Sequence, residues 1–82
     1  EAIDVLTRAL KMIPGKDRPS TQHRDLVLVL CEAHIKRGQW AEAYNVHGKE
    51  LGSGQHGLVA QMQKARLDTW AAITGGGATP PR

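Results

Sequence analysis

The sequence predicts an all-α fold of about four antiparallel helices, on the strength of three observations. Apolar residues recur at spacings of three and four along most of the chain, which is the periodicity of one helix face. Glycine and proline gather mainly between these stretches, where helices end. The pair Glu42-Ala43, which follows a turn at Gly38, repeats the Glu1-Ala2 of the start. Such an echo is typical of helical repeats, and the short connections favour antiparallel neighbours.

The length of 82 residues allows one small domain with a thin core. The chain has no Phe, two Trp and one Tyr, so Leu, Val, Ile and Ala must supply most of the buried area. We expect a stability of only ~3–5 kcal/mol for a unit of this size. Because Glu1 opens inside the first helical stretch, we expect the chain to be a terminal piece of a longer solenoid, or to pair with another chain.

Charge, cysteine content and hydropathy limit the cellular setting. The net charge of +3 is spread along the chain, whereas a nucleic-acid module usually clusters its basic residues, so we do not expect nucleic acid as the partner. Cys31 is the single cysteine and cannot form an internal disulfide, which favours a reducing, cytoplasmic location. The apolar run Leu26–Cys31 has six residues, far below the ~18 that span a bilayer, so we expect no membrane contact.

The first helix is predicted over residues 1–13. Its apolar stripe consists of Ala2, Ile3, Leu6, Ala9, Leu10 and Ile13. Pro14 ends this helix because it cannot continue the hydrogen-bond ladder. A polar connector follows, in which Ser20 or Thr21 is placed to cap the next helix through its side-chain oxygen.

The second helix is predicted over residues 21–37, although its centre is ambiguous. The run Leu26–Leu30 is rich in β-branched residues and would also suit a buried strand. Polar flanks extend the segment beyond strand length, and Lys36 and Arg37 complement a helix C-terminus. Gly38 then provides the left-handed stop. The apolar centre indicates a helix that is packed on two sides.

The third and fourth helices are predicted over residues 39–51 and 55–73. Gly48 weakens the third helix and is expected to mark a close helix contact. The helical segment therefore covers residues 1–74, and residues 75–82 form a flexible tail. The stripe expected on the third helix is Trp40, Ala43, Tyr44, His47 and Leu51. The residues expected to face inward on the fourth helix are Leu58, Val59, Met62, Ala65, Trp70 and Ile73.

Residues 1–14 carry the first half of a family resemblance. Ala2 stands where two helices would cross closely, and Leu6 occupies a large apolar position. An Ala9-Leu10 pair follows, and Pro14 closes the segment. This order resembles the second helix of a tetratricopeptide (TPR) repeat, in which small residues at crossings let the backbones approach.

Residues 24–52 resemble a second TPR repeat. The matching positions are Val27, Leu30, Cys31, His34, Gly38, Trp40 and Ala43. The end departs from the pattern, since His47 replaces an aromatic residue, Glu50 replaces an alanine, and no proline follows Leu51. The two repeats are 41 residues apart, which is longer than the usual ~34 and is similar to long-linker TPR variants. The resemblance implies a terminal solenoid fragment with residues 55–73 as its capping helix.

The resemblance also implies a binding surface, because the first helix of each TPR repeat lines the concave face of the stack. The residues that would face inward there are Asp25, Leu28, Glu32, Ile35 and Lys36. The alternative is that Leu28 and Ile35 are ordinary core residues and that the charged side chains are only solvated. TPR proteins that clamp a terminal carboxylate need Lys and Asn where this chain has Leu28 and Glu32, so a carboxylate clamp is not expected.

Trp70 is a further candidate contact, because it lies near the end of the last predicted helix. A half-exposed tryptophan at that place would act as an interface anchor. The alternative is that Trp70 packs on Met62 or Leu51. The apolar run Leu26–Leu30 would favour self-association if a neighbouring repeat were absent.

Catalytic and metal chemistry is not expected. The four histidines are separated by 11, 13 and 9 residues, which matches no usual pair of metal ligands on one helix, and His34 and His47 more simply replace packing aromatics. Cys31 lies within an apolar helical run, where a thiol is normally buried and inert. Residues 52–57 lack the Lys-Ser/Thr of a phosphate-binding loop. We therefore predict no enzyme activity, cofactor or metal.

The function expected from these observations is a non-catalytic protein–protein interaction module that binds a peptide or a partner subunit. One alternative is an RNA-binding helical repeat of the pentatricopeptide kind, whose turn resembles residues 36–43. Another is a peptide-sensing regulatory domain of a larger transcription factor or enzyme.

Overall fold

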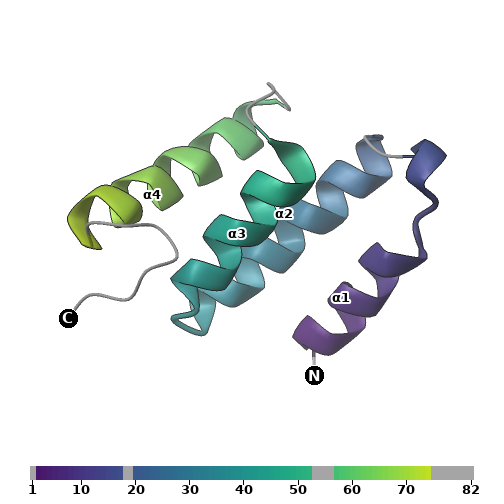
Figure 1. The fold of residues 1–82 in the computed structure, drawn as a ribbon, viewed down its shortest axis with the longest axis horizontal. Helices are drawn as coiled ribbons and strands as arrows, with labels where there is room; N and C mark the ends of the chain where they lie inside the picture. Colours follow the sequence, from purple (N-terminus) through teal and green to yellow (C-terminus); the bar gives the residue numbers. More distant parts are fainter. Residues whose placement is uncertain (1, 18–19, 53–56, 75–82) are drawn as a thin grey trace.

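The computed structural model describes residues 2–17, 20–52 and 57–74. They form α1 (Ala2–Met12), the short 3₁₀ turn η1 (Gly15–Asp17), α2 (Thr21–Lys36), α3 (Trp40–Leu51) and α4 (Leu58–Thr74) (Figure 1). In these ranges the chain has four α-helices and no strand, which confirms the predicted all-α class. The ambiguous run Leu26–Leu30 is helical. The predicted tail, residues 75–82, lies outside the described residues.

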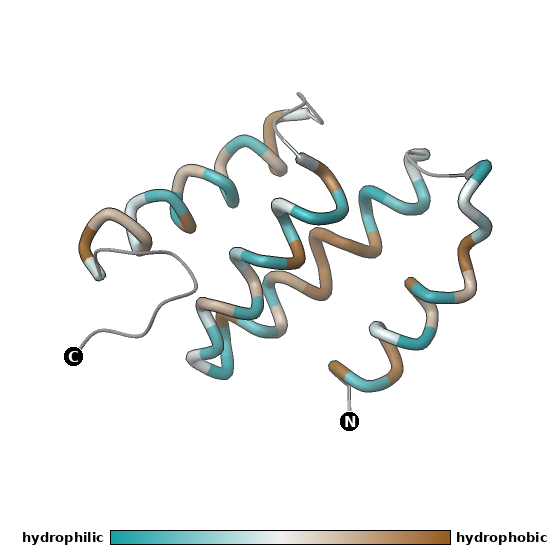
Figure 2. Tube along the Cα trace, viewed as in Figure 1, coloured by the Kyte–Doolittle hydropathy of each residue, from teal (hydrophilic) through white to brown (hydrophobic). Residues whose placement is uncertain are grey.

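The central helix of the fold is α2, which packs against α1, α3 and α4. In Figure 1, α1 and α4 lie on opposite sides of the α2–α3 pair, and α4 also packs against α3. Figure 2 shows a hydrophobic stretch in the middle of α2, as expected for a helix that is covered on more than one side. The apolar residues of the core are Leu10, Val27, Leu30, Cys31, Ile35, Ala43, Leu51, Ala60 and Leu67.

The N-terminus of α2 is capped by Ser20. This residue is extended, with φ −142° and ψ 169°, and its side-chain oxygen accepts a hydrogen bond from the backbone N–H of His23 at 3.1 Å. One of the backbone donors that a helix start leaves unpaired is thereby satisfied. Of the two capping candidates, Ser20 is the cap and Thr21 is the first helical residue.

The C-terminus of α2 ends in a Schellman motif at Gly38, which has φ +77°. The backbone N–H of Gly38 donates to the carbonyl of Ile35 at 2.9 Å, and that of Gln39 donates to the carbonyl of His34 at 2.8 Å. These two bonds satisfy carbonyls that the helix end would otherwise leave unpaired. The left-handed stop predicted from the sequence is confirmed.

The inward face predicted for the fourth helix is wrong except at Trp70, which is half-buried and packs against Tyr44. The buried residues of α4 are Ala60, Gln63 and Leu67, spaced by three and four, and they form a narrow face against α2 and α3. A polar residue can occupy this face because the Gln63 side-chain Nε2 donates to the Leu28 carbonyl at 2.9 Å. The large apolar residues left exposed on α4 are Leu58, Val59, Met62 and Ile73.

The close helix contact expected at Gly48 is also wrong. Gly48 is exposed on α3, and a Cβ built at this position would have no atom within 4 Å. Its φ is not positive, so the backbone there does not require glycine. Gly48 therefore lowers the helix stability without a packing reason.

Replacing Gly38 by alanine is expected to destabilise the protein by ~1–2 kcal/mol. At φ +77° the Cβ of an alanine would lie too close to the following carbonyl oxygen. The space around Gly38 is open, so no steric clash adds to this cost. The free energy of unfolding measured with urea tests it. An unchanged midpoint of urea unfolding in Gly38→Ala would contradict the requirement for glycine at this turn.

Replacing Gly48 by alanine is expected to have the opposite sign and to stabilise the protein by ~0.5–1 kcal/mol. The added methyl group meets no neighbour and removes backbone freedom from the unfolded chain. Urea unfolding of Gly48→Ala beside Gly38→Ala gives a matched comparison of the same substitution in two backbone conformations. A loss of stability in Gly48→Ala would contradict the open environment.

Candidate functional site

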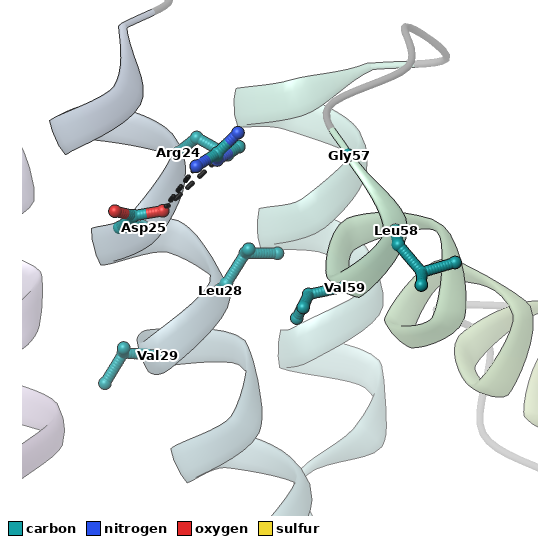
Figure 3. Close-up of a pocket in the computed structure, with 7 residues that line it drawn as sticks. All are labelled: Arg24, Asp25, Leu28, Val29, Gly57, Leu58 and Val59. Atoms are coloured by element: carbon teal, nitrogen blue, oxygen red, sulfur yellow. Dashed lines mark hydrogen bonds and ion pairs between the residues drawn. The ribbon is translucent and has the colours of Figure 1, made fainter.

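A groove of about 330 Å³ runs between the N-terminal half of α2 and the start of α4 (Figure 3). We call it the α2–α4 groove. Figure 3 shows that α2 and the beginning of α4 supply its two walls. The residues that line it are Arg24, Asp25, Leu28, Val29, Gly57, Leu58 and Val59.

The two walls are held together by polar contacts between α2 and α4. The hydrogen bond from Gln63 to the Leu28 carbonyl is formed by a buried side chain, so breaking it would leave buried polar atoms unpaired. One turn further along both helices, Arg66 Nη1 lies 3.0 Å from Glu32 Oε1. This second pair is half exposed and contributes little to the stability of the fold. It does help to fix the position of α4 along α2. The position of α4 beside α2 is thus fixed by one contact to the lining residue Leu28 and by one contact beyond the groove.

The walls themselves are aliphatic and open to solvent. Val29 is 54% exposed, Leu58 is 69% exposed and Val59 is 64% exposed, while Leu28 is half-buried against the core. Exposed apolar side chains that gather around a concavity mark an interaction site more often than scattered ones do. The arrangement can therefore take up apolar side chains from another molecule.

The polar rim of the groove consists of Arg24 and Asp25. The Arg24 Nη2 and Nε atoms lie 3.0 and 3.2 Å from Asp25 Oδ1. The guanidinium also lies beside Gly57, where a Cβ would be 3.6 Å from Arg24 Nη1. Because the two charges are opposite and adjacent, the lining has no net charge, and it presents no basic stripe.

The structure brings together two of the five residues expected on the second helix. Asp25 and Leu28 line the α2–α4 groove. Glu32 lies further along α2 in the ion pair with α4, and Lys36 is exposed at the end of the helix. Ile35 is buried in the core, which is the alternative that the sequence left open for it, and it presents no surface for binding.

Sequence reasoning missed the wall that α4 supplies. Leu58 and Val59 were expected to point inward, and Val29 was treated only as part of an apolar run. The available signal was the position of Ala60, Gln63 and Leu67, which share one helix face at spacings of three and four. A search for apolar periodicity does not find this face, because one of its three residues, Gln63, is polar.

Trp70 lies away from the α2–α4 groove, half-buried in the second half of α4. Its ring is 6.0 Å from the Tyr44 ring, centroid to centroid, at a tilt of 52°. Trp70 and Trp40 line a second groove together with Arg66, Thr69 and Ile73, and we call it the tryptophan groove. The packing partner is therefore Tyr44 on α3.

Three of the four histidines lie within helices that the structure describes, and His56 lies outside the described residues. His23, His34 and His47 are all buried. His23 Nε2 lies 2.9 Å from Glu50 Oε1 and joins the start of α2 to the end of α3, a pair that sequence reasoning missed. Among the residues that the structure describes, no three His, Cys, Asp or Glu side chains gather as metal ligands would.

Cys31 is fully buried between α2 and α3. Its Sγ lies 3.5 Å from the Ala43 carbonyl oxygen, to which the thiol donates a weak hydrogen bond. Burial, with a smaller contribution from the charge of Glu32, raises the pKa of Cys31 from 9.0 to about 12. Because the thiolate is the nucleophilic form, a raised pKa makes this side chain unreactive.

None of the protein families, curated proteins or solved structures compared with this chain matches it. Within residues 2–17, 20–52 and 57–74, no helix is both long and apolar enough to cross a membrane.

The raised pKa of Cys31 predicts a pH dependence of stability. The unfolded thiol ionises near pH 9 and the folded one near pH 12, so the contribution of Cys31 is complete below pH 9 and falls as the pH rises above it. The stability advantage of the wild type over Cys31→Ala should shrink between pH 9 and about 11. Comparing the two proteins isolates the contribution of the Cys31 thiol. An advantage that stays constant over this range would contradict the burial of the thiol.

Proposed function

We propose that this chain is a non-catalytic protein-interaction module that binds a short apolar peptide segment of a partner protein in the α2–α4 groove. The observation that carries this proposal is the aliphatic lining of the groove, in which Leu28 on α2 points toward Val59 on α4 (Figure 3). The aliphatic side chains of Val29, Leu58 and Val59 in this lining are exposed to solvent. The lining of the groove has no net charge.

The affinity would come from burial of the exposed aliphatic groups. Full burial of one valine or leucine side chain contributes ~1.5–3 kcal/mol, and the partner's own apolar side chains add a similar amount. Association costs an estimated ~4–15 kcal/mol in lost freedom. A groove with three exposed aliphatic residues therefore suits a weak, reversible complex with a dissociation constant of about 1–100 μM.

The rim chemistry supports an uncharged peptide over a nucleic acid. Phosphate recognition draws its affinity from several cations along one surface. The single cation in the lining, Arg24, is already paired with Asp25. The RNA-binding alternative thus has no observation in its favour at this groove.

The order of the helices supports a TPR-like reading of the module. On that reading α2 and α3 form one repeat, α1 is the second helix of the repeat before it, and α4 is the first helix of the next. The change of direction between successive helices in Figure 1 supports this assignment. The α2–α4 groove would then lie between two adjacent first helices, on the concave side of a superhelical stack.

The proposal predicts that Val59→Glu weakens peptide binding by about tenfold or more, because the added charge would be buried against aliphatic groups. Suitable probes are fluorescein-labelled peptides selected from a random phage-displayed library against the wild-type chain. Binding is measured by fluorescence anisotropy. The selected peptides are expected to be rich in Leu, Ile, Val and Met.

Val5→Glu is the matched control, because Val5 is 62% exposed on α1, outside the α2–α4 groove. It should change the affinity by less than about twofold, within the range of a surface substitution away from the interface. Equal losses in both variants would contradict the assignment of the groove. Binding of single-stranded RNA with a steep salt dependence would favour the rival function, and dimerisation through Val59 would replace the peptide by a second copy.

A further inference from the structure

α4 carries an exposed face on the side away from its buried residues. The helix lies at the edge of the fold, with the α2–α3 pair between it and α1 (Figure 1). The residues of this face recur at spacings of three and four, and all of them are exposed. They are Leu58, Met62, Ala65, Thr69 and Ile73, and we call them the outer face of α4.

The outer face presents large apolar groups to water over the length of the helix. Leu58 is 69% exposed, Met62 is 60% exposed and Ile73 is 80% exposed. Exposed apolar groups that gather on one surface mark an interaction site. Because these residues follow the helical spacing, they form a ridge of the kind that packs against a second helix. We therefore expect a helix, rather than an extended segment, to cover this face.

The outer face is nearly symmetric about its midpoint, which lies at Ala65. Leu58 precedes Ala65 by seven residues, and Ile73 follows it by eight. If α4 of a second copy packed here in the antiparallel direction, Leu58 of one copy would lie beside Ile73 of the other, and Met62 would lie beside Thr69. Ala65 is small and exposed, so the two helices could approach closely where they cross.

The charges that flank the outer face have almost the same midpoint. Lys64 Nζ lies 2.7 and 3.0 Å from the two carboxylate oxygens of Asp68, which follows it by four residues. In an antiparallel pair of identical helices, Lys64 of each copy would face Asp68 of the other. A parallel pair would instead set like charges opposite each other, which is unfavourable. Arg66 also lies near the midpoint, and its charge is compensated by Glu32.

We propose that two copies of this chain form an antiparallel dimer through the outer face of α4. An interface around a two-fold axis must be complementary to itself, and both the apolar residues and the charges of this face meet that requirement. Because each copy supplies only three large apolar side chains, we expect a weak dimer with a dissociation constant on the order of 100 μM. This inference goes beyond the proposed function, because the outer face shares only Leu58 with the α2–α4 groove.

Substitution at the midpoint of the face tests the dimer and its direction together. Ala65→Glu and Ala65→Lys each place two like charges beside the two-fold axis, so either variant alone should dimerise at least about tenfold more weakly than the wild type. An equimolar mixture of the two variants should regain dimerisation, because opposite charges then meet at the axis. Sedimentation equilibrium from about 10 μM to about 1 mM measures the dissociation constants of the wild type, both variants and the mixture.

Val5→Glu is the matched control, because Val5 is 62% exposed on α1, beyond the α2–α3 pair. It should change the dissociation constant of the dimer by less than about twofold. The Ala65 variants alter an exposed helical position, so their circular dichroism should match that of the wild type. A wild type that stays monomeric at about 1 mM would overturn the proposal, and so would a mixture that dimerises no better than its components.

Peptide binding separates this inference from the proposed function. Ala65 does not line the α2–α4 groove, so Ala65→Glu should bind the selected peptides with an affinity within about twofold of the wild type. Val59→Glu has the opposite role, because it tests the groove. If no peptide bound the α2–α4 groove, the dimer would still be expected, and loss of the dimer alone would leave peptide binding intact.

Discussion

The burial of α2 on three sides is the constraint on which the rest of the structure depends. Val27, Leu30 and Cys31 are almost completely shielded, and they are covered by α1, α3 and α4 together. With no phenylalanine in the chain, this burial requires close approach of the helices rather than large side chains. Small residues at the contacts, Ala43 on α3 and Ala60 on α4, permit that approach.

The way in which α4 meets this constraint creates both grooves. Its buried face is narrow and ends in Ala60 and Leu67. Of its large apolar residues, Leu58, Val59, Met62 and Ile73 stay exposed. At the start of the helix Leu58 and Val59 form one wall of the α2–α4 groove, and near its end Ile73 forms the edge of the tryptophan groove. A wider apolar contact would have buried these residues and left a smooth surface. The exposed apolar area is therefore a direct consequence of how this helix packs.

Local signals made the helices predictable, and long-range contacts limited the prediction of the site. Ser20 and Gly38 act through neighbours three or four residues away, so the sequence alone limits the cap to Ser20 or Thr21 and identifies Gly38 as the stop. Gln63 acts through a carbonyl 35 residues distant, and no local pattern reveals that a glutamine will be buried there. The pairing of His23 with Glu50 on another helix is equally hidden, because each residue alone resembles a surface or packing position.

Arg66 connects the two grooves in one chain of contacts. Its guanidinium is paired with Glu32 on α2, one turn beyond the groove residue Leu28, and it also lies over Trp40 in the tryptophan groove. A ligand that shifted this guanidinium in one groove would therefore change a helix–helix contact that borders the other. Val59 and Ile73 each belong to a single groove and are exposed, so changes at these positions separate the two surfaces without disturbing the contact that joins them.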